Sequence, residues 1–152
     1  MKRHLPKSIL IASVICALIA CMPILASCGS SSENTSHTVD YGTSELYTQA
    51  DMDSAIDVIM AEFDTWKGAQ MKSIAFTDDK TCEDNVAYCN ELRADGDPEF
   101  DQAIVFTSSF HSPGGEDAEG TAWEPYTDYD GWTWTLGRTN GGEWKLLTWG
   151  YA

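Results

Sequence analysis

The longest amphipathic pattern in this chain covers residues 50–67 and predicts a helix. Its apolar positions recur at intervals of three and four residues and therefore share one helix face: Met52, Ala55, Ile56, Ile59, Phe63 and Trp66. Thr48 and Asp51 have the spacing of a capping box at the start of this helix. Gly68 is typical of the position that follows a helix end. We expect a long helix whose apolar face is buried in a core.

A strand and a shorter helix are expected next along the chain. Residues 69–77 alternate in polarity and predict a strand that ends at a cluster of charged residues. Thr81 and Asp84 then have the spacing of a second capping box. The helix that they open is expected to run to about Ala94, with Val86 on its apolar face.

The second half of the chain has the alternating pattern of strands, in residues 103–110, 126–138 and 143–149. In the middle segment Trp132 and Trp134 share one face, whereas Thr133 and Thr135 share the other. Asn140-Gly141-Gly142 is a hairpin signal. Because no helix separates these strands, their sheet should be mainly antiparallel. The predicted fold is α+β: a long N-terminal helix packed against a curved, mainly antiparallel sheet of about four strands, with a second short helix.

The N-terminal pattern is that of a bacterial lipoprotein signal. A basic start, an apolar stretch over residues 9–26 and the small residues Ala26 and Ser27 precede Cys28. Such a signal is cut before the cysteine, which then carries the acyl chains. An uncleaved membrane helix is the alternative, since about 18 apolar residues approach spanning length. Pro23 and the small residues before Cys28 argue against it.

These segments predict a lipoprotein signal peptide over residues 1–27, a flexible tether over 28–46 and a single α+β domain over 47–152. The tether is expected because its residues are polar and small and have little to bury. The predicted location is the extracytoplasmic face of the cell membrane. The membrane is the expected partner, through the lipid on Cys28.

The charge of the chain argues against nucleic acid as a partner. The chain has 9 Lys and Arg against 24 Asp and Glu, for a net charge of −15. Without residues 1–27, which carry three basic residues and no acidic one, the net charge is −18. Phosphate groups would be repelled. Solubility explains this acidity more simply than an acidic docking surface does.

Cys82 and Cys89 are the two cysteines outside the signal and the lipidation position. An even pair outside the cell favours a disulfide. In a straight helix, however, seven residues rise about 10.5 Å, and a disulfide needs Cα atoms within about 7 Å. The pair is bridged if the chain around Cys82 is not helical, and otherwise both thiols stay free. We expect the bridge.

Signals for catalysis and for metal binding are weak. The acidic segments 95–97 and 128–131 lack the closing ligand of a calcium loop and are better interpreted as turns. His111 is the single histidine of the predicted domain, so zinc ligands are not expected. Ser108 and Ser109 lie near His111 in sequence, but without a nucleophile elbow. We therefore expect no metal, no cofactor and no catalytic residue.

Aromatic residues are concentrated toward the C-terminal end. Five of the six tryptophans lie between Trp123 and Trp149, and most of them should fill the core between sheet and helix. Trp149 has the opposite parity to Trp144, so one of these two should be exposed. Trp123 and Tyr126 follow a Gly-rich acidic loop, residues 112–121. We expect Trp123, Tyr126 and Trp149 to contact a ligand such as a sugar, a peptide or a cell-wall fragment.

The tail of the chain resembles a known class of domain. The similar residues are 126–136, Arg138, Gly141-Gly142, Trp144-Lys145 and the closing Trp149-Gly150-Tyr151. They resemble small lipoprotein domains of unknown function from Gram-positive gut bacteria, which are similar to the cystatin-like and nuclear-transport-factor-two-like group. In that group a long helix packs in a curved antiparallel sheet. The likeness covers about residues 47–151 and implies a fold and a location but no activity.

The sequence thus favours a non-catalytic, membrane-anchored module that binds a small ligand or a protein. Two alternatives remain open. One is a small pocket-type enzyme that uses an acid pair with His111, and the other is an inhibitor or immunity-type protein. A deep pocket beside His111 would favour the enzyme.

Overall fold

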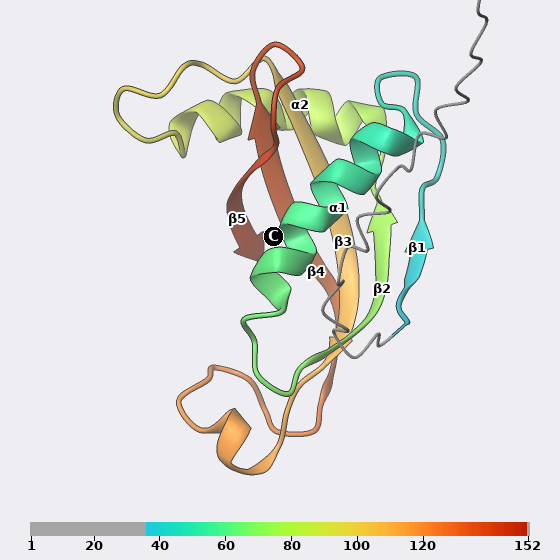
Figure 1. Ribbon diagram of the computed structural model, residues 1–152, viewed down its shortest axis with the longest axis vertical. Coiled ribbons are helices and arrows are strands. Elements are labelled where there is room, and N and C mark those ends of the chain that lie inside the picture. Colours follow the sequence, from blue (N-terminus) through green and yellow to red (C-terminus); the bar gives the residue numbers. More distant parts are fainter. Residues whose placement is uncertain (1–35, 152) are drawn as a thin grey trace, which may run out of the picture. The chain divides into compact units, whose positions relative to one another are not determined.

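Five strands and two α-helices form the part of the chain that this computed structural model describes, residues 36–151. In chain order they are β1 Thr38–Asp40, α1 Gln49–Phe63, β2 Gln70–Phe76, α2 Asp79–Glu91, β3 Gln102–His111, β4 Asp128–Arg138 and β5 Lys145–Gly150. A short 3-10 helix, η1 Gly115–Ala118, lies between β3 and β4. The strands form one open sheet in sequence order (Figure 1). The fold is α+β, but the sheet has five strands and is mixed, because β1 runs parallel to β2.

Helix α1 begins where the sequence predicts and ends earlier. The Thr48 side chain accepts from the Asp51 N–H, and the Asp51 carboxylate accepts from the Thr48 N–H, so the capping box is formed. The helix ends at Phe63, and beyond it the N–H groups of Thr65 and Trp66 bond three residues back, which tightens the chain into a turn. Trp66 belongs to the apolar stripe of the sequence but lies in this turn, outside the helix.

The N-cap of helix α2 lies three residues before the predicted cap, Thr81. This N-cap is Asp78, whose carboxylate accepts from the Thr81 N–H at 2.8 Å. The predicted cap, Thr81, therefore lies in the first turn of the helix, and Asp84 has no capping role. An aspartate is as good an N-cap as a threonine, and the sequence offered both.

The folded domain begins earlier than expected. Thr38–Asp40 forms an edge strand beside β2, and the Ser44 hydroxyl donates to the Asp79 carboxylate of α2. Tyr47 is buried and donates its hydroxyl to a backbone carbonyl of β3 at 2.6 Å. Residues 38–46, which were expected to belong to the flexible tether, are thus part of the fold. Val39 and Tyr41 also pack against the hydrophobic core, but such isolated apolar residues form no periodic pattern in the sequence.

The two faces of the sheet carry different side chains. We call a set of residues that are paired side by side across the strands a rung. One rung is Phe76–Phe106–Trp134–Trp149, and the next is Ala75–Thr107–Thr133–Gly150. Successive residues of a strand point to opposite faces, so we call the first the aromatic face and the second the threonine face. Helix α1 crosses the sheet on the aromatic face (Figure 1). Helix α2 packs on the threonine face, with Cys89 against Ala103.

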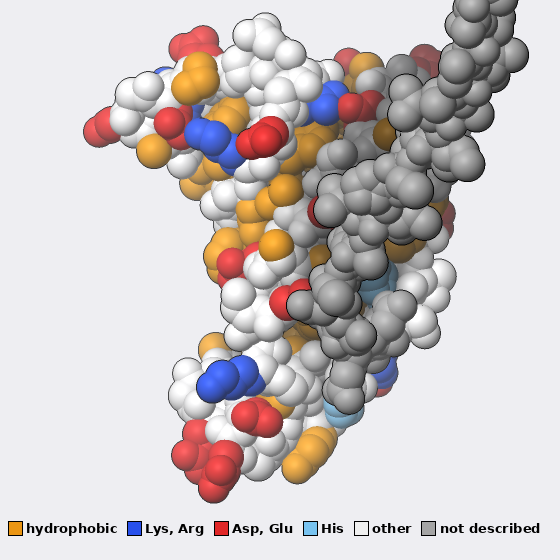
Figure 2. Space-filling view, viewed as in Figure 1, with side chains coloured by type: hydrophobic (Ala, Val, Ile, Leu, Met, Phe, Trp, Pro, Cys, Tyr) orange, Lys and Arg blue, Asp and Glu red, His pale blue; other side chains and the backbone are white. Residues whose placement is uncertain are grey.

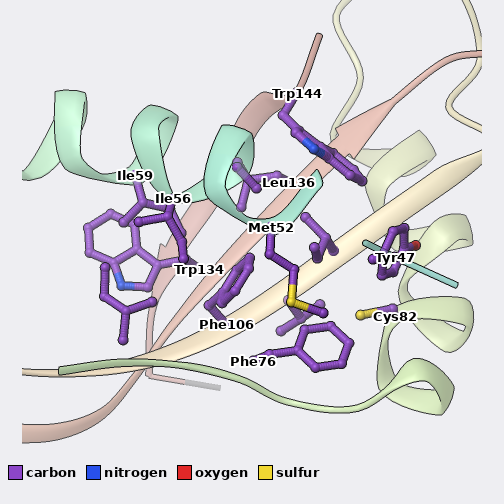
Figure 3. Close-up of a cluster of buried hydrophobic side chains, with 14 of the residues drawn as sticks. Tyr47, Met52, Ile56, Ile59, Phe76, Cys82, Phe106, Trp134, Leu136 and Trp144 are labelled. Carbon is purple, nitrogen blue, oxygen red and sulfur yellow. The ribbon is translucent and has the colours of Figure 1, made fainter. Parts of the chain in front are cut away.

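The main core lies between α1 and the aromatic face. Figure 3 shows Ile56 and Ile59 of α1 directed toward the Trp134 ring of β4. Trp134 is fully buried and donates its ring N–H to the Ser108 hydroxyl at 2.8 Å. Trp66 stacks on Trp134 with ring centroids 5.3 Å apart. The indole is therefore enclosed on all sides, with its polar atom paired.

A β-bulge between β4 and β5 determines the face on which Trp149 lies. Leu146 pairs with Leu136 and Thr148 pairs with Thr135, so Leu147 is an extra residue in β5. After the bulge Trp149 pairs with Trp134, and the two rings stack at 6.3 Å. The expectation that one of Trp144 and Trp149 is exposed is confirmed, since Trp149 is 42% exposed and Trp144 is buried. Simple alternation could not include the bulge, however, and placed the Trp149 ring on the other face of the sheet.

Within residues 36–151, no helix has the length and apolar character needed to cross a membrane. The predicted signal peptide, residues 1–27, and the predicted lipidation site, Cys28, lie outside the described residues.

Candidate functional site

A pocket of about 420 Å³ lies on the threonine face, lined by α2, β3, β4 and β5. Half of its lining residues are threonines: Thr77, Thr81, Thr107, Thr133, Thr135 and Thr148. The others are Asn85, Tyr88, Val105, Trp149, Gly150 and Tyr151. We call this site the threonine pocket. Its volume lies within the roughly 300–1,000 Å³ that is common for small-molecule sites.

The pocket exists because α2 covers only part of the threonine face. The helix packs through Cys89 and Val86 against Phe100, Ala103 and Leu147, near the start of β3. The rung Ala75–Thr107–Thr133–Gly150 lies beyond that cluster and carries only small side chains. Because these side chains are small and α2 packs beside them, a space remains on the threonine face. On the aromatic face the corresponding space is filled by aromatic rings.

Four of the threonine hydroxyls have no partner within the described part of the chain. Thr77 donates to a backbone carbonyl at 2.9 Å, and Thr81 donates to the Asp78 carboxylate at 2.8 Å. The hydroxyls without a hydrogen bond to any residue of 36–151 are those of Thr107, Thr133, Thr135 and Thr148. Asn85 donates its amide N–H to the Thr81 carbonyl. The amide oxygen of Asn85 is a further acceptor at this site.

The threonine pocket carries no formal charge, although the chain has a net charge of −15. None of its lining residues is Asp, Glu, Lys, Arg or His. Acidic side chains are scattered over the viewed face of the molecule instead of gathered in one place (Figure 2). A ligand in the pocket therefore meets hydroxyl, amide and apolar groups.

A second pocket, of about 520 Å³, lies at the N-terminal end of α1 and contains an ion pair. Arg138 is 8% exposed and donates from Nη1 to the Asp51 carboxylate at 2.7 Å. It also donates from Nε to Gln102 at 2.7 Å. Its guanidinium lies 4.2 Å from the centre of the Trp144 ring, a cation–π arrangement.

This ion pair explains the acidity of Asp51. Hydrogen bonds from Thr48 and from Arg138 lower the pKa of Asp51 from 3.8 to about 2. The positive charge of Arg138 is thus already matched, and Glu143 adds a further acid to the lining. We therefore assign the pair to the stability of the fold and not to ligand binding.

The three aromatic residues expected at a ligand site are not brought together. Trp149 is 42% exposed and borders the threonine pocket, although its ring stacks on the aromatic face. Trp123 is half-buried, and its ring packs on Trp66 with centroids 4.9 Å apart. Tyr126 is 71% exposed and does not line the pocket. Only Trp149 of the three therefore belongs to the candidate site.

The loop that precedes Trp123 is held at its base by a buried serine. Ser112 has no exposed surface; it donates to the Glu124 carbonyl at 2.6 Å and accepts from the Thr127 N–H at 2.9 Å. Residues 112–121, expected as a long mobile loop, contain η1 and leave from this closed base. The closed base of the loop returns the chain to the domain, where Trp123 packs on Trp66.

His111 lies beside a carboxylate at the surface. Its Nδ1 is 2.6 Å from Oδ1 of Asp128, which also accepts from Lys72 at 2.7 Å. The Lys72 and His111 hydrogen bonds lower the pKa of Asp128. His111 lines neither of the two pockets described above, and no Ser, Thr or Cys of residues 36–151 donates to its ring. The neighbouring Ser109 pairs instead with Ser73, at 2.6 Å between the hydroxyls.

The expected disulfide between Cys82 and Cys89 is not formed. Both residues lie in α2, seven positions apart, and both are free and fully buried. Cys82 packs in the main core, whereas Cys89 packs in the smaller cluster under α2. Burial raises the pKa of each thiol to about 11. Because both residues lie in one straight helix, the geometry keeps the two thiols apart, and their raised pKa keeps both in the unreactive protonated form.

Sequence reasoning placed Thr133 and Thr135 on one face but gave them no role. The missed signal is that threonines follow one another across three strands, at Thr107, Thr133, Thr135 and Thr148. It becomes visible only when the register is known. Within residues 36–151, no group of three or more His, Cys, Asp or Glu residues is arranged to hold a metal ion.

Comparisons of the chain with protein-family models, with curated proteins and with solved structures found no match.

Proposed function

We propose that this chain is a lipid-anchored, extracytoplasmic protein that binds a ligand without catalysis in the threonine pocket. The observation that carries this proposal is an uncharged pocket in which four threonine hydroxyls have no partner among the described residues. Polar groups that leave water without a partner cost about 1–3 kcal/mol each. A ligand that pairs with these hydroxyls avoids that cost, and the sheet holds them in fixed positions before binding.

A catalytic function has less support. The His111–Asp128 pair would be its base, but it lies outside both pockets and no nucleophile is hydrogen-bonded to it. A base must reach the proton that it removes, directly or through one water. We also propose, on the tail motifs alone, a relationship to the cystatin-like and nuclear-transport-factor-two-like group, in which α1 would be the long helix of a curved sheet.

The anchor is tested by Cys28→Ser in a bacterial host that lipidates its own lipoproteins, with Cys21→Ser as the matched control. Labelled palmitate should enter the wild type and Cys21→Ser, and both should partition into the detergent phase. Cys28→Ser should take up no label. Palmitate incorporation into Cys28→Ser would overturn the anchoring proposal.

The pocket is tested by methyl NMR on the full chain with labelled threonine, in a phosphocholine detergent. The ligand panel contains neutral trisaccharides, an acidic trisaccharide and a capped tripeptide. At least one compound should shift the methyl signals of Thr107, Thr133, Thr135 and Thr148 in a saturable way. The signals of Thr38 and Thr65, which lie outside the pocket, should stay in place. If no compound moves the four pocket signals, the binding proposal fails.

A further inference from the structure

We infer that the ligand of the threonine pocket is a short neutral oligosaccharide, an inference that rests on the proposed binding function. Each free hydroxyl in the pocket can donate one hydrogen bond and accept two. The hydroxyls of a sugar have the same capacity, so each contact can form in either direction. The Asn85 amide oxygen adds an acceptor at the α2 side of the pocket.

The arrangement of the four hydroxyls suits a ring with several polar groups on one side. Thr107 pairs with Thr133 across β3 and β4, and Thr135 pairs with Thr148 across β4 and β5. Paired residues have Cβ atoms about 5 Å apart, and positions i and i+2 of a strand are separated by about 7 Å. The four side chains thus form a staggered row across three strands, with neighbours about 5–7 Å apart, spacings that suit the hydroxyls of one or two sugar rings.

The pocket also offers the apolar contacts that a sugar ring needs for its C–H groups. Each threonine carries a methyl group beside its hydroxyl, and Val105 lies in the same rung as Thr135. Tyr88 is 43% exposed on α2 and lines the pocket. An exposed tyrosine ring is a flat apolar surface with a polar tip, suited to stacking on a sugar.

The structure favours a saccharide over a peptide. Extended peptides are usually recognised at the edge of a sheet, through free backbone N–H and C=O groups. Three of the four free hydroxyls, those of Thr107, Thr133 and Thr135, stand on β3 and β4, whose backbones are paired on both sides; of the strands that line the pocket only β5 is at the edge of the sheet. Recognition at these positions must therefore come from side chains, and here these are mainly hydroxyls.

Charge and polarity exclude two further classes of ligand. An anionic ligand would enter a protein of net charge −15 and find no cationic side chain in the pocket. A purely apolar ligand would leave the four hydroxyls without partners. A neutral, hydroxyl-rich molecule avoids both costs.

The experiment uses the threonine-methyl NMR described above on the full chain. The neutral probes are maltotriose, cellotriose and N,N′,N″-triacetylchitotriose; the acidic probe is trigalacturonic acid, and the peptide probe is N-acetyl-trialanine amide. A phosphocholine detergent is required, because maltoside headgroups would themselves act as sugar probes. At least one neutral trisaccharide should shift the four pocket methyl signals at millimolar concentration, and trigalacturonic acid should not.

Variants then locate the contacts. Thr133→Val and Thr148→Val each remove one hydroxyl but keep the β-branched shape, and each should weaken binding of the active trisaccharide about fivefold. Thr38→Val, in β1, is the matched control and should leave the affinity unchanged. Tyr88→Ala should weaken binding by a similar factor. Tyr126→Ala, which removes an exposed ring outside the pocket, should not.

The outcomes separate this inference from the function on which it rests. If the capped tripeptide shifts the pocket methyl signals and no trisaccharide does, the pocket binds ligands but the saccharide assignment is wrong. If trigalacturonic acid binds as tightly as the neutral sugars, the charge argument is wrong. If a trisaccharide binds but Thr133→Val and Thr38→Val have the same affinity, the sugar binds elsewhere. If no probe shifts the pocket signals, both proposals fail.

Discussion

Neighbouring rungs of the sheet carry very different side chains on its two faces. On the aromatic face, Phe106 and Trp134 are paired under α1 and are fully buried. One residue along the same strands, Thr107 and Thr133 are paired on the threonine face, where they border a pocket of about 420 Å³. The same strands therefore supply a filled core on one side and an open site on the other.

The difference comes from side-chain volume and helix cover, because the backbone pairing is common to both faces. Large rings on the aromatic face make many close contacts and supply most of the apolar burial. The threonine face contributes little of that burial, so its residues can serve another purpose at small cost to stability. The comparison predicts large energetic effects of substitutions on one face and large binding effects on the other.

Trp134→Ala should have the largest effect, a loss of about 3–5 kcal/mol in the free energy of unfolding, because it empties the centre of the aromatic face. Urea denaturation measures this loss. The control is Trp149→Ala, which removes the ring stacked on Trp134 but 42% exposed, and which should cost clearly less. Equal losses for the two variants would mean that the core is not centred on Trp134.

Asp51→Asn should come next, with a loss of about 2 kcal/mol at neutral pH. The pKa of Asp51 is lowered from 3.8 to about 2 in the folded state, so the folded protein binds its proton less readily than the unfolded chain does. The stabilisation is therefore complete above about pH 4 and is lost as the pH falls toward 2. The stability difference between wild type and variant should shrink over that range. A difference that stays constant from pH 6 to pH 2 would exclude the Asp51–Arg138 pair as its cause.

Cys82→Ala and Cys89→Ala should each cost about 1 kcal/mol, because each removes one buried sulfur atom from a packed cluster. Loss of a native disulfide would instead cost about 2–5 kcal/mol in either variant. Alkylation of the unfolded, unreduced protein should label both cysteines, as read from peptide masses. An unlabelled Cys82–Cys89 peptide pair would show that the helix opens to form a bridge.

Thr133→Val and Thr135→Val should have the smallest effect on stability, within about 0.5 kcal/mol of the wild type. Valine keeps the shape of the side chain and suits a strand. Thermal unfolding and ligand titration of the same samples would compare the two properties directly. Strong destabilisation by either variant would show that the threonine hydroxyls serve the fold and not a ligand.

The sequence predicts local elements well where one periodic signal acts alone. The start of α1 followed from Thr48 and Asp51, whose capping box is formed. The end of α1 could not be predicted in the same way, because Trp66 fits the apolar stripe of the helix but contacts the core from the turn that follows it. The cap of α2 was misplaced because Asp78 and Thr81 are both good caps, and only the surrounding structure selects between them.

Features that depend on how the strands pair could not be predicted from a single amino-acid sequence. The strand Thr38–Asp40 has only three residues, too few to show an alternating pattern, and only its position beside β2 makes it a strand. The bulge at Leu147 reverses the expected face of Trp149. The threonine pocket combines residues from several strands and α2, so its threonines look like ordinary surface positions until the register is known.

The short edge strand has a mechanical consequence if the chain is held by its N-terminal side. Tension would enter the domain through Thr38–Asp40, which is joined to β2 by three residue pairs, whereas nine pairs join β3 to β4. The edge strand would peel away first, and the hydrogen bond from Ser44 to Asp79, followed by the buried Tyr47, would carry the load next. Releasing residues 38–43 adds about 20 Å of extended chain. The domain could thus yield by that length under a pull while the strands that border the threonine pocket stay paired.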